Sequence, residues 1–295
     1  MPETLRIATI NTGGTWGRIL AWLADGVKAA GFQIELLKLG GEVPELALAV
    51  DKGEADISVT TTFAARAAHE GKAPYSKRLR IRGLSELQYP MHWFVNMARA
   101  DLEIDSFADL AEKHPAVRFC LPAPNMVVSY PVRGIFGHFG IDPYEDVPRW
   151  GGKVITDFSS VPRLIASGEA DGVFRENSPL RYDPSQSRAM NFFSLTEAEA
   201  RKLAEELRIK PSLIPAGTYK NQEKDLWTLD AEGFTLYCRS DLPEETTYRV
   251  AEVIDRSTST HYLGSSIFYS PRFAVQTGMP LHPGAQSYFR RLGYL

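Results

Sequence analysis

The sequence predicts an α/β fold made of two similar Rossmann-like lobes. Short β-rich runs alternate with apolar residues at helical spacing, and glycine turns separate them. This alternation is typical of a parallel sheet whose strands are joined by helical crossovers. The tetrapeptide Gly-Glu-Ala-Asp also occurs twice, at residues 53–56 and 168–171. The chain has 295 residues, and at roughly 150 residues per domain this length indicates about two domains.

The first series of elements leads to a run of hydroxyl side chains. A turn at residues 11–14 follows the first strand, and a second glycine turn at residues 40–41 follows the second. Pro44 suits the first turn of the next helix, where its missing N–H costs nothing. The third strand ends in the threonines at residues 60–62. The expected strands cover residues 5–10, 32–37 and 55–59, and the expected helices cover 19–31 and 44–53.

The second series begins near residue 117 and carries the same signals. Pro131 should bend or delay the helix expected over residues 125–139, because proline cannot donate a helical hydrogen bond. Thr196 is expected to cap a further helix, with Glu199 as its capping-box partner. Strands are expected over residues 117–121, 154–156, 172–175, 191–195 and 234–238, and helices over 125–139, up to 167, 196–207 and 244–257.

The repeated tetrapeptide indicates how the two lobes are built. In each case a helix ends at glycine, Glu-Ala-Asp forms a tight turn, and a central strand starts. We assign residues 1–92 and 236–295 to lobe I and residues 93–235 to lobe II, with crossovers near 90–97 and 230–238. Ligands of open α/β sheets bind at the carboxyl ends of the strands, so we expect a central ligand cleft. The alternative is that the tetrapeptide is only a good helix-to-strand turn that arose twice.

Composition and motifs exclude several classes of function. Lys and Arg number 33 against 36 Asp and Glu, so the net charge of −3 offers no basic field to a nucleic acid. Cys120 and Cys238 lie far apart and are expected to be small buried side chains. The six histidines lack metal-ligand spacing, and no P-loop, dinucleotide fingerprint or Gly-x-Ser-x-Gly motif occurs. We expect no metal, no cofactor, no catalytic residue and no nucleic-acid partner.

The start of the chain leaves two locations open. It begins Met-Pro-Glu-Thr and enters the first expected strand without a basic-then-apolar leader. No apolar stretch approaches the roughly 18 residues that cross a bilayer. We expect either a cytoplasmic protein or a mature periplasmic chain with an added start Met, and a monomer in both cases.

Four segments resemble a family of transport receptors. Residues 8–16, which end in Asn-Thr-Gly-Gly-Thr-Trp, are similar to the family's first strand and Gly-Gly-Thr-Tyr turn. Residues 40–56 occupy the place of its second glycine loop and third strand. Residues 214–219 are similar to its Ile-Pro-x-Gly-Thr-Tyr, and residues 281–293 to its closing His-Pro-Gly-Ala motif. The chain thus resembles the substrate-binding receptors of the TAXI class of tripartite (TRAP) transporters, which have the type II periplasmic binding protein fold.

The resemblance implies a receptor that delivers a solute to integral membrane transporter subunits. Three segments depart from the family pattern. Residues 16–18 are Trp-Gly-Arg where the family has two aromatics and proline, and residues 60–62 are threonines where it often has Gln-Ser-Asp. Residues 123–129 replace its Gly-Ser-Gly-Thr loop. The amino-acid ligands common in the family are therefore not carried over to this chain.

Lobe I is expected to contact the ligand through backbone amides, hydroxyls and one aromatic ring. The glycine turn lets the backbone approach a ligand, and the next helix presents its N-terminus. Trp16 is expected to stack on the ligand, or else to fill the core or rim. Arg18 is either an anion ligand or a solvated side chain, and the threonines are either ligands or a helix cap. The set in lobe I is Asn11, Thr12, Gly14, Thr15, Trp16, Arg18, Thr60, Thr61 and Thr62.

Lobe II is expected to supply a cation. Arg175 follows the second central strand, and a guanidinium binds a carboxylate through two hydrogen bonds. The alternative for Arg175 is a surface pair with Glu176 or a salt bridge between the lobes. Asn125 and Ser129 are either ligand contacts or caps, and Phe174 is expected to exclude water from the ligand.

Together these residues predict a solute-binding protein that closes by a hinge on a small carboxylate-bearing organic acid, an aromatic acid included. The rival hypothesis is a cytosolic enzyme of the same fold, a decarboxylase or lyase that acts on an aromatic acid. His92 or Glu176 would then be the acid–base group. Binding is favoured because no acid–base pair stands out by its spacing.

Overall fold

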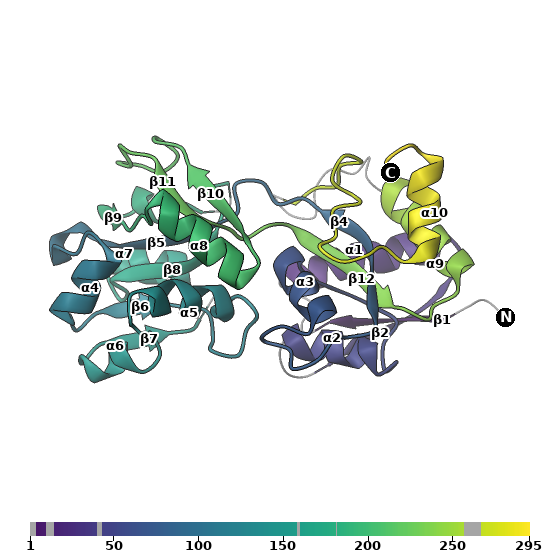
Figure 1. Cartoon of the computed structure of the whole chain (residues 1–295), viewed down its shortest axis with the longest axis horizontal. Coiled ribbons are helices and arrows are strands. Elements are labelled where there is room, and N and C mark those ends of the chain that lie inside the picture. The colour runs from purple at the N-terminus through teal and green to yellow at the C-terminus, as the bar shows by residue number, and fades with distance from the viewer. Residues whose placement is uncertain (1–3, 10–14, 40–42, 158–159, 181, 257–266) are drawn as a thin grey trace. The chain divides into compact units, whose positions relative to one another are not determined.

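The computed structural model describes residues 4–9, 15–39, 43–157, 160–180, 182–256 and 267–295. The chain folds into two compact units. Unit 1 comprises Met1–Pro90 and Glu232–Leu295, and unit 2 comprises Met91–Ala231. The chain therefore passes from one unit to the other twice (Figure 1). Both passages lie slightly earlier in the chain than the boundaries placed from the sequence. No helix in the described ranges is long and apolar enough to cross a membrane.

Unit 1 is built on a sheet of five strands within its described residues. The strands are β1 (Thr4–Thr9), β2 (Gln33–Lys38), β3 (Ile57–Thr61), β4 (Ile81–Leu87) and β12 (Phe234–Arg239). Their order is β2-β1-β3-β12-β4. The pairs of β1 with β2 and β3 are parallel, whereas β12 runs antiparallel to both of its neighbours. The strands β1, β2, β3 and β4 therefore run in the same direction, and their carboxyl ends lie at the same edge of the sheet.

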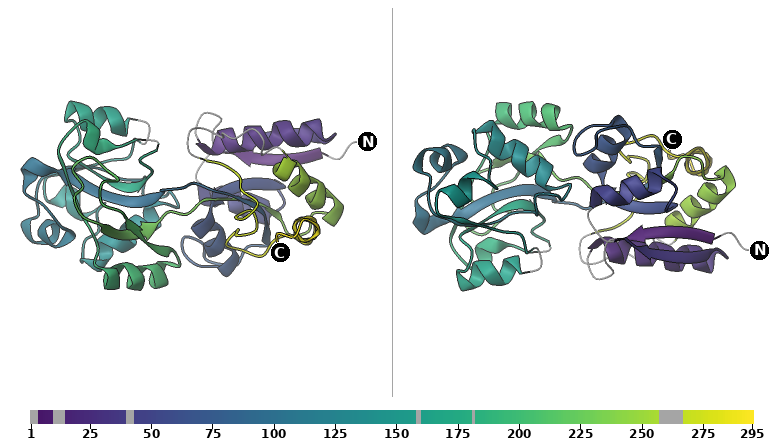
Figure 2. Two further views of the ribbon diagram at one scale, coloured as in Figure 1. Left: turned by 90° about the horizontal axis from the view of Figure 1, so that it is seen from above. Right: turned by 90° about the horizontal axis from the view of Figure 1, so that it is seen from below.

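Helices cover both faces of this sheet (Figure 2). They are α1 (Thr15–Ala29), α2 (Val43–Asp51), α3 (Thr62–Glu70), α9 (Glu244–Arg256) and α10 (Pro283–Arg291). Side chains of α1, α9 and α10 share one apolar core with the sheet, around Ile7 and Leu236. Side chains of α2 and α3 pack against the other face in a second core around Tyr237. Burial on both faces explains why β3 is apolar or small at every position.

Unit 2 is built on a sheet of seven strands within its described residues. The strands are β5 (Trp93–Arg99), β6 (Arg118–Cys120), β7 (Lys153–Ile155), β8 (Gly172–Asn177), β9 (Met190–Phe192), β10 (Lys210–Ile214) and β11 (Leu226–Asp230). The helices are α4 (Phe107–Lys113), α5 (Ser129–His138), α6 (Asp146–Arg149), α7 (Val161–Ser167) and α8 (Glu197–Leu207). The strand order is β10-β11-β5-β8-β6-β7, and β9 also pairs with β5.

The two sheets contain the same four-strand arrangement. The order β2-β1-β3-β12 in unit 1 corresponds to β7-β6-β8-β5 in unit 2, with three parallel strands and one antiparallel strand in each. Gly53 and Gly168 both have a φ of 75°, a left-handed conformation that favours glycine, and each follows a helix. The repeated tetrapeptide therefore occupies equivalent positions in the two sheets, and the predicted α/β fold with two similar lobes is confirmed.

The last residue of the first tetrapeptide, Asp56, ties three strands together. Its buried carboxylate accepts hydrogen bonds from Arg6 of β1, through the backbone N–H (2.8 Å), Nε (3.1 Å) and Nη2 (2.8 Å). Arg239 at the end of β12 places its Nε 2.9 Å from the same carboxylate. One aspartate at the start of β3 thus holds both neighbouring strands.

Asp171, the last residue of the second tetrapeptide, has partners in equivalent positions in unit 2. Its buried carboxylate accepts hydrogen bonds from Arg118 of β6, through the backbone N–H (2.8 Å), Nε (2.9 Å) and Nη2 (2.7 Å). Arg99 at the end of β5 places its Nη1 3.1 Å away. The tetrapeptide is therefore a structural device at the amino edge of each sheet, opposite the edge where ligands of such sheets bind.

The arginines also keep both aspartates ionised. Burial alone would raise the pKa of each carboxyl group. Hydrogen bonds and charge attraction from Arg6 and Arg239 outweigh burial at Asp56, so its pKa lies below the ordinary aspartate value. Arg118 and Arg99 lower the pKa of Asp171 in the same way.

Most of the expected helices and strands are present. The differences occur where pairing between strands, rather than the local sequence, decides the structure. The helix expected over residues 125–139 starts only at Ser129, with Pro131 in its first turn, as a delayed start predicts. Trp93 and Phe94, expected at a crossover, lie in β5. The turns expected at residues 11–14 and 40–41 lie outside the described residues.

The sequence missed four strands and four helices, namely β4, β5, β10, β11, α3, α4, α6 and α10. The sequences of β4 and β10 contain Arg, Glu, Lys and Pro, which do not favour a strand. Pairing with neighbouring strands stabilises these two segments as strands.

The carboxylate clamps predict a stability loss that depends on pH. Replacing Asp56 or Asp171 with Asn should lower the free energy of unfolding at pH 7 by about 3 kcal/mol, the low end for a broken buried ion pair. Because both folded-state pKa values are lowered, this stabilisation is complete above the unfolded pKa of about 3.9 and is lost as the pH falls below it. Urea titrations at pH 7 and at acidic pH measure the effect. The exposed Asp25→Asn is the control, and equal midpoints for all three variants would contradict the prediction.

Candidate functional site

Three threonines lie at the carboxyl edge of the unit 1 sheet. Thr60 and Thr61 end β3, Thr62 begins α3, and all three are buried. Thr62 Oγ1 donates a hydrogen bond to Glu86 Oε2 at 2.9 Å. The Oγ1 atoms of Thr60 and Thr61 are buried and have no hydrogen-bond partner within the described ranges. Because buried hydroxyls are normally paired, this strand end has unused hydrogen-bonding capacity.

The same segment forms the N-terminus of α3. Thr61 is the N-cap residue, with an extended backbone, but its side chain makes no capping hydrogen bond. The expectation that a threonine hydroxyl caps this helix is therefore wrong for Thr61. The first-turn N–H groups of a helix carry partial positive charge and suit an acceptor with negative charge. This end of unit 1 combines a helix N-terminus with the Thr61 hydroxyl, which has no hydrogen-bond partner among the described residues. Thr60 precedes it on β3 and points to the opposite face of the strand.

An aromatic group lies in the same unit near the start of β12. The ring of Trp16 meets that of Phe234 edge to face at 5.7 Å between centroids. Tyr89 stacks on the other side of the group, 5.9 Å from Phe234. Trp16 is half-buried against the apolar core, which is the core or rim position that the sequence left as the alternative. Only Trp16 of these three rings was predicted from the sequence.

The other residues predicted in lobe I are placed as follows. Thr15 is the half-buried first residue of α1, and Arg18 is exposed in its first turn. Asn11, Thr12 and Gly14 lie outside the described residues.

Two buried acids near the threonines were not predicted. Glu86 of β4 is 8% exposed and accepts the hydrogen bond from Thr62. Glu232 is 5% exposed, and its two carboxylate oxygens lie 2.9 and 3.1 Å from Nη2 of Arg66. Residues 66 and 232 are separated by 166 positions, so no sequence spacing could have indicated this pair.

In unit 2, Arg175 lies in the second half of β8 and its side chain is only 8% exposed. Its Nε donates to the backbone carbonyl of Glu176 at 3.2 Å, and its Nη2 lies 3.4 Å from Glu176 Oε1. The second contact is long for a charge-assisted hydrogen bond, which is normally 2.7–2.9 Å. The predicted Arg175–Glu176 pair exists, but it is buried rather than on the surface, and its geometry is weak.

Ser129 and Asn125 differ in what they can offer a ligand. The buried Ser129 hydroxyl lies 2.8 Å from the carbonyl of Pro124 and 2.7 Å from that of Met126. Tyr144 donates to the carbonyl of Pro122 at 2.7 Å, so both hydroxyls hold the loop that precedes α5. Asn125 is exposed on this loop. Ser129 is therefore a loop-positioning residue, whereas Asn125 is accessible.

Phe174 is placed in the interior of unit 2. It is fully buried, and its ring lies within 4.5–5.2 Å of the rings of Phe119, Phe136 and Phe193. Successive side chains of a strand point to opposite faces, so Phe174 and Arg175 cannot share a surface. We correct the sequence-based prediction: Phe174 belongs to the apolar core and does not shield a ligand.

Of the two groups of the rival enzyme hypothesis, His92 is buried and Glu176 is partly buried. His92 is 4% exposed next to the first passage between the units, and Glu176 lies beside Arg175. Cys120 and Cys238 are free and buried, as expected. Burial raises the pKa of the Cys120 thiol to about 11 and also raises the pKa of Cys238, so neither is a reactive thiolate at neutral pH.

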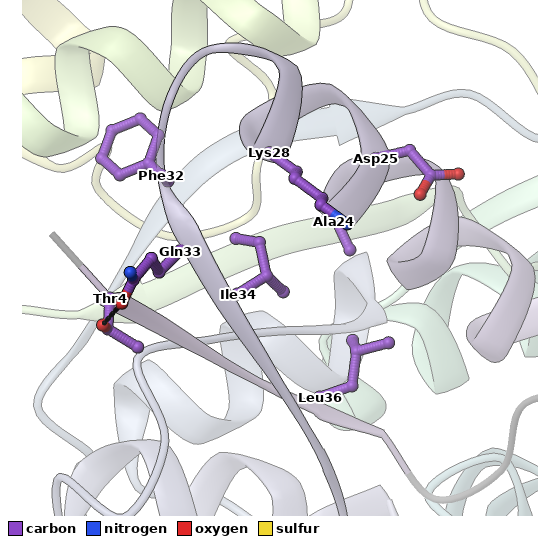
Figure 3. Close-up of a pocket in the computed structure, with 8 residues that line it drawn as sticks. All are labelled: Thr4, Ala24, Asp25, Lys28, Phe32, Gln33, Ile34 and Leu36. Atoms are coloured by element: carbon purple, nitrogen blue, oxygen red, sulfur yellow. Dashed lines mark hydrogen bonds between the residues drawn. The ribbon is translucent and has the colours of Figure 1, made fainter. Parts of the chain in front are cut away.

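One groove of about 590 Å³ lies on unit 1, away from the predicted residues (Figure 3). It lies between α1 and the edge strand β2, with Phe32, Ile34 and Leu36 among its apolar lining residues. Thr4 donates to Gln33 Oε1 across one end at 3.2 Å. Leu36 is 50% exposed there. None of the residues expected to bind ligand lines this groove.

Solved structures show which fold this is. The chain is similar to a binding protein component of an ABC phosphonate transporter from Pseudomonas aeruginosa, at 16% identity over 92% of this chain and 82% of that chain, with a TM-score of 0.52. It is also similar to MatC from Rhodopseudomonas palustris with bound malate, at 12% identity over 98% and 97% of the two chains, with a TM-score of 0.54.

A third similar structure is a protein from Prochlorococcus marinus in complex with methylphosphonate. It is 10% identical over the full length of both chains, with a TM-score of 0.53. At these identities the similarity shows the fold alone, which is the two-lobed fold of periplasmic binding proteins. A sequence model of the NMT1-like family matches residues 7–293. The chain belongs to the NMT1-like family.

Proposed function

We propose that this chain is a solute-binding protein whose ligand is a small organic anion. The observation that carries the proposal is the buried Thr61 hydroxyl at the N-cap of α3, which has no hydrogen-bond partner among the described residues. Hydroxyl donors and a helix N-terminus together favour negative charge. Two of the similar structures contain bound anions, malate and methylphosphonate, which supports this chemistry.

In unit 2, Arg175 is proposed as the cation that the ligand meets. Its largely buried side chain carries a positive charge. Its Nη2 lies 3.4 Å from Glu176 Oε1, whereas a ligand carboxylate at 2.7–2.9 Å would make a shorter hydrogen bond. We favour a carboxylate over other anions because its planar, two-oxygen geometry matches the guanidinium. Asn125 is an accessible further contact.

The aromatic group adds a preference for an apolar part of the ligand. Trp16 is half-buried, so part of its indole is accessible, and its ring packs edge to face against Phe234, which in turn stacks on Tyr89. Indole faces stack on planar groups. An organic acid with an aromatic or other flat apolar portion therefore fits unit 1 better than a fully polar one.

The resemblance to TAXI receptors supplies the finer part of the proposal. We propose that the chain serves a TRAP-type transporter from the periplasm, that it delivers its ligand to integral membrane subunits, and that its lobes close on the ligand by a hinge. One of the similar solved structures is a component of an ABC transporter, so the TRAP assignment rests on the resemblance.

A thermal-shift series tests the proposed ligand class. Malate, methylphosphonate and benzoate represent an organic acid, a phosphonate and an aromatic acid, and uncharged benzamide is the control for benzoate. A ligand at 100 times its Kd stabilises the folded state by about 2.7 kcal/mol. We expect stabilisation by a carboxylate and none by benzamide. Chemical change of a stabilising acid, followed by NMR, would favour the enzyme hypothesis instead.

The role of Arg175 is tested by a substitution that keeps its charge. Arg175→Lys should weaken binding of a stabilising carboxylate at least tenfold, about 1.4 kcal/mol, because an ammonium cannot form the two parallel hydrogen bonds. Arg149, an exposed arginine of α6, provides the matched Arg149→Lys control. Isothermal titration measures both. Unchanged affinity in a folded Arg175→Lys protein would remove this residue from the site.

The threonines allow a comparison between binding and stability. Thr61→Val removes a hydroxyl without a partner, so it should leave the free energy of unfolding within about 0.5 kcal/mol of wild type and weaken anion binding. Thr62→Val removes the hydrogen bond to Glu86 and should destabilise the protein by about 1–3 kcal/mol. Urea denaturation and titration calorimetry on both variants separate the two roles. A destabilised Thr61→Val with normal affinity would refute the assignment.

A further inference from the structure

The residues at the two passages between the units share an unusual backbone conformation. Met91 has a φ of 54° and Glu232 has a φ of 57°, and each is the first residue after a unit boundary. Neither is glycine, for which positive φ is unstrained. A side chain in the left-handed region costs roughly 1 kcal/mol or more, and surrounding contacts must hold it there. The two residues differ in how they are held.

Glu232 is held by a buried ion pair. Its side chain is 2% exposed, and both carboxylate oxygens face Nη2 of Arg66, at 2.9 and 3.1 Å. Arg66 lies on α3, one turn after the first residue of that helix. Met91, in contrast, is 37% exposed.

The backbone next to Glu232 is held by the same helix. The N–H of Thr62 donates to the carbonyl of Gly233 at 3.0 Å. Gly233 lies so close to β4 that an added Cβ would come within 2.3 Å of the carbonyl oxygen of Leu87. Helix α3 therefore holds the chain at two successive residues, through an amide of its first turn and through a guanidinium one turn later.

On the unit 2 side of the passages, the two chain segments are tied to each other. The N–H of Ala231 donates to the carbonyl of His92 at 2.8 Å, and Asp230 pairs with Trp93 in the sheet. These are backbone contacts between strands. On the unit 1 side, the Arg66–Glu232 ion pair and the hydrogen bond from Thr62 to Gly233 hold the entering chain.

We propose that the Arg66–Glu232 ion pair acts as a latch that fixes the direction in which the chain enters unit 1, and thereby limits the orientations that the two units sample. A buried ion pair adds little net stability compared with apolar packing, and selecting one geometry is its better-attested use. The left-handed φ of Glu232 is the strained conformation that the latch maintains. Arg66 is a positioning residue in this scheme, since it acts through the backbone at Glu232.

The latch also adjoins the proposed ligand contacts. Thr60 and Thr61 immediately precede α3, the helix that carries Arg66. If the proposed function holds, an anion bound at the start of α3 acts on the same helix that holds the passage. This link rests on the proposed function, whereas the latch itself can be tested without any ligand.

Spin-label distance measurements on the full chain test the latch. Labels on Ala21→Cys in α1 and Glu112→Cys in α4, two exposed helix positions in different units, report the distribution of distances between the units. The native cysteines are buried and free, and a protein without the added cysteines gives the background. Glu232→Gln and Arg66→Gln each remove one charge of the latch and should broaden the distribution.

The matched control is Asp51→Asn in the same unit. Asp51 is equally buried and pairs with Lys77 and Arg80 at the end of α2, without contact to a passage. It should lower the melting temperature and leave the distribution as in wild type. A wild-type distribution for folded Glu232→Gln, or an equal broadening for Asp51→Asn, would overturn the proposal. If Glu232→Gln does not fold, the distance distribution is measured for the milder Arg66→Lys variant, and a wild-type distribution for that variant would overturn the proposal.

Discussion

A buried aspartate held between two arginines fixes the central strands of each unit. Asp56 and Asp171 stand at the starts of β3 and β8, and each receives hydrogen bonds from the strand on one side and an ion pair from the strand on the other. Because a carboxylate in this position must keep all its partners, the order and register of three strands depend on it. The rest of each unit is arranged around these strands.

This constraint separates structure from function within each sheet. The amino edge uses its buried carboxylates in the clamps. At the carboxyl edge of unit 1, the Thr60 and Thr61 hydroxyls have no hydrogen-bond partner among the described residues, and the Thr61 side chain does not cap α3. We therefore place the proposed ligand site at the carboxyl edge, where ligands of open α/β sheets generally bind. The latch between Arg66 and Glu232 links that edge to the path of the chain between the units.

The candidate site shows where sequence reasoning succeeds and where it stops. Thr60, Thr61 and Arg175 lie in the carboxyl halves of β3 and β8, close to where the sequence placed them, because a strand end is a local property; their role as ligand contacts stays a prediction. Phe174 was misassigned because a neighbour in sequence lies on the opposite face of a strand, and only the packing of Phe119, Phe136 and Phe193 shows which face is interior. The helix expected from residue 125 starts at Ser129, whose hydroxyl is used by the preceding loop. Glu86 and Glu232 were missed since their partners lie far away in the chain.

The sequence alone determined the α/β class, the two similar lobes and most helix and strand positions, because these follow from local periodicity, glycine turns and a repeated tetrapeptide. It also indicated that the tetrapeptide joins a helix to a central strand in each lobe, and left open that such a turn had only arisen twice. Only the tertiary structure decided that Asp56 and Asp171 are clamps, that β4 and β10 are strands, and which hydroxyls have no partner. The physical reason is that ion pairs, strand pairing and burial join residues remote in sequence, so their outcome depends on the folded arrangement of the whole unit.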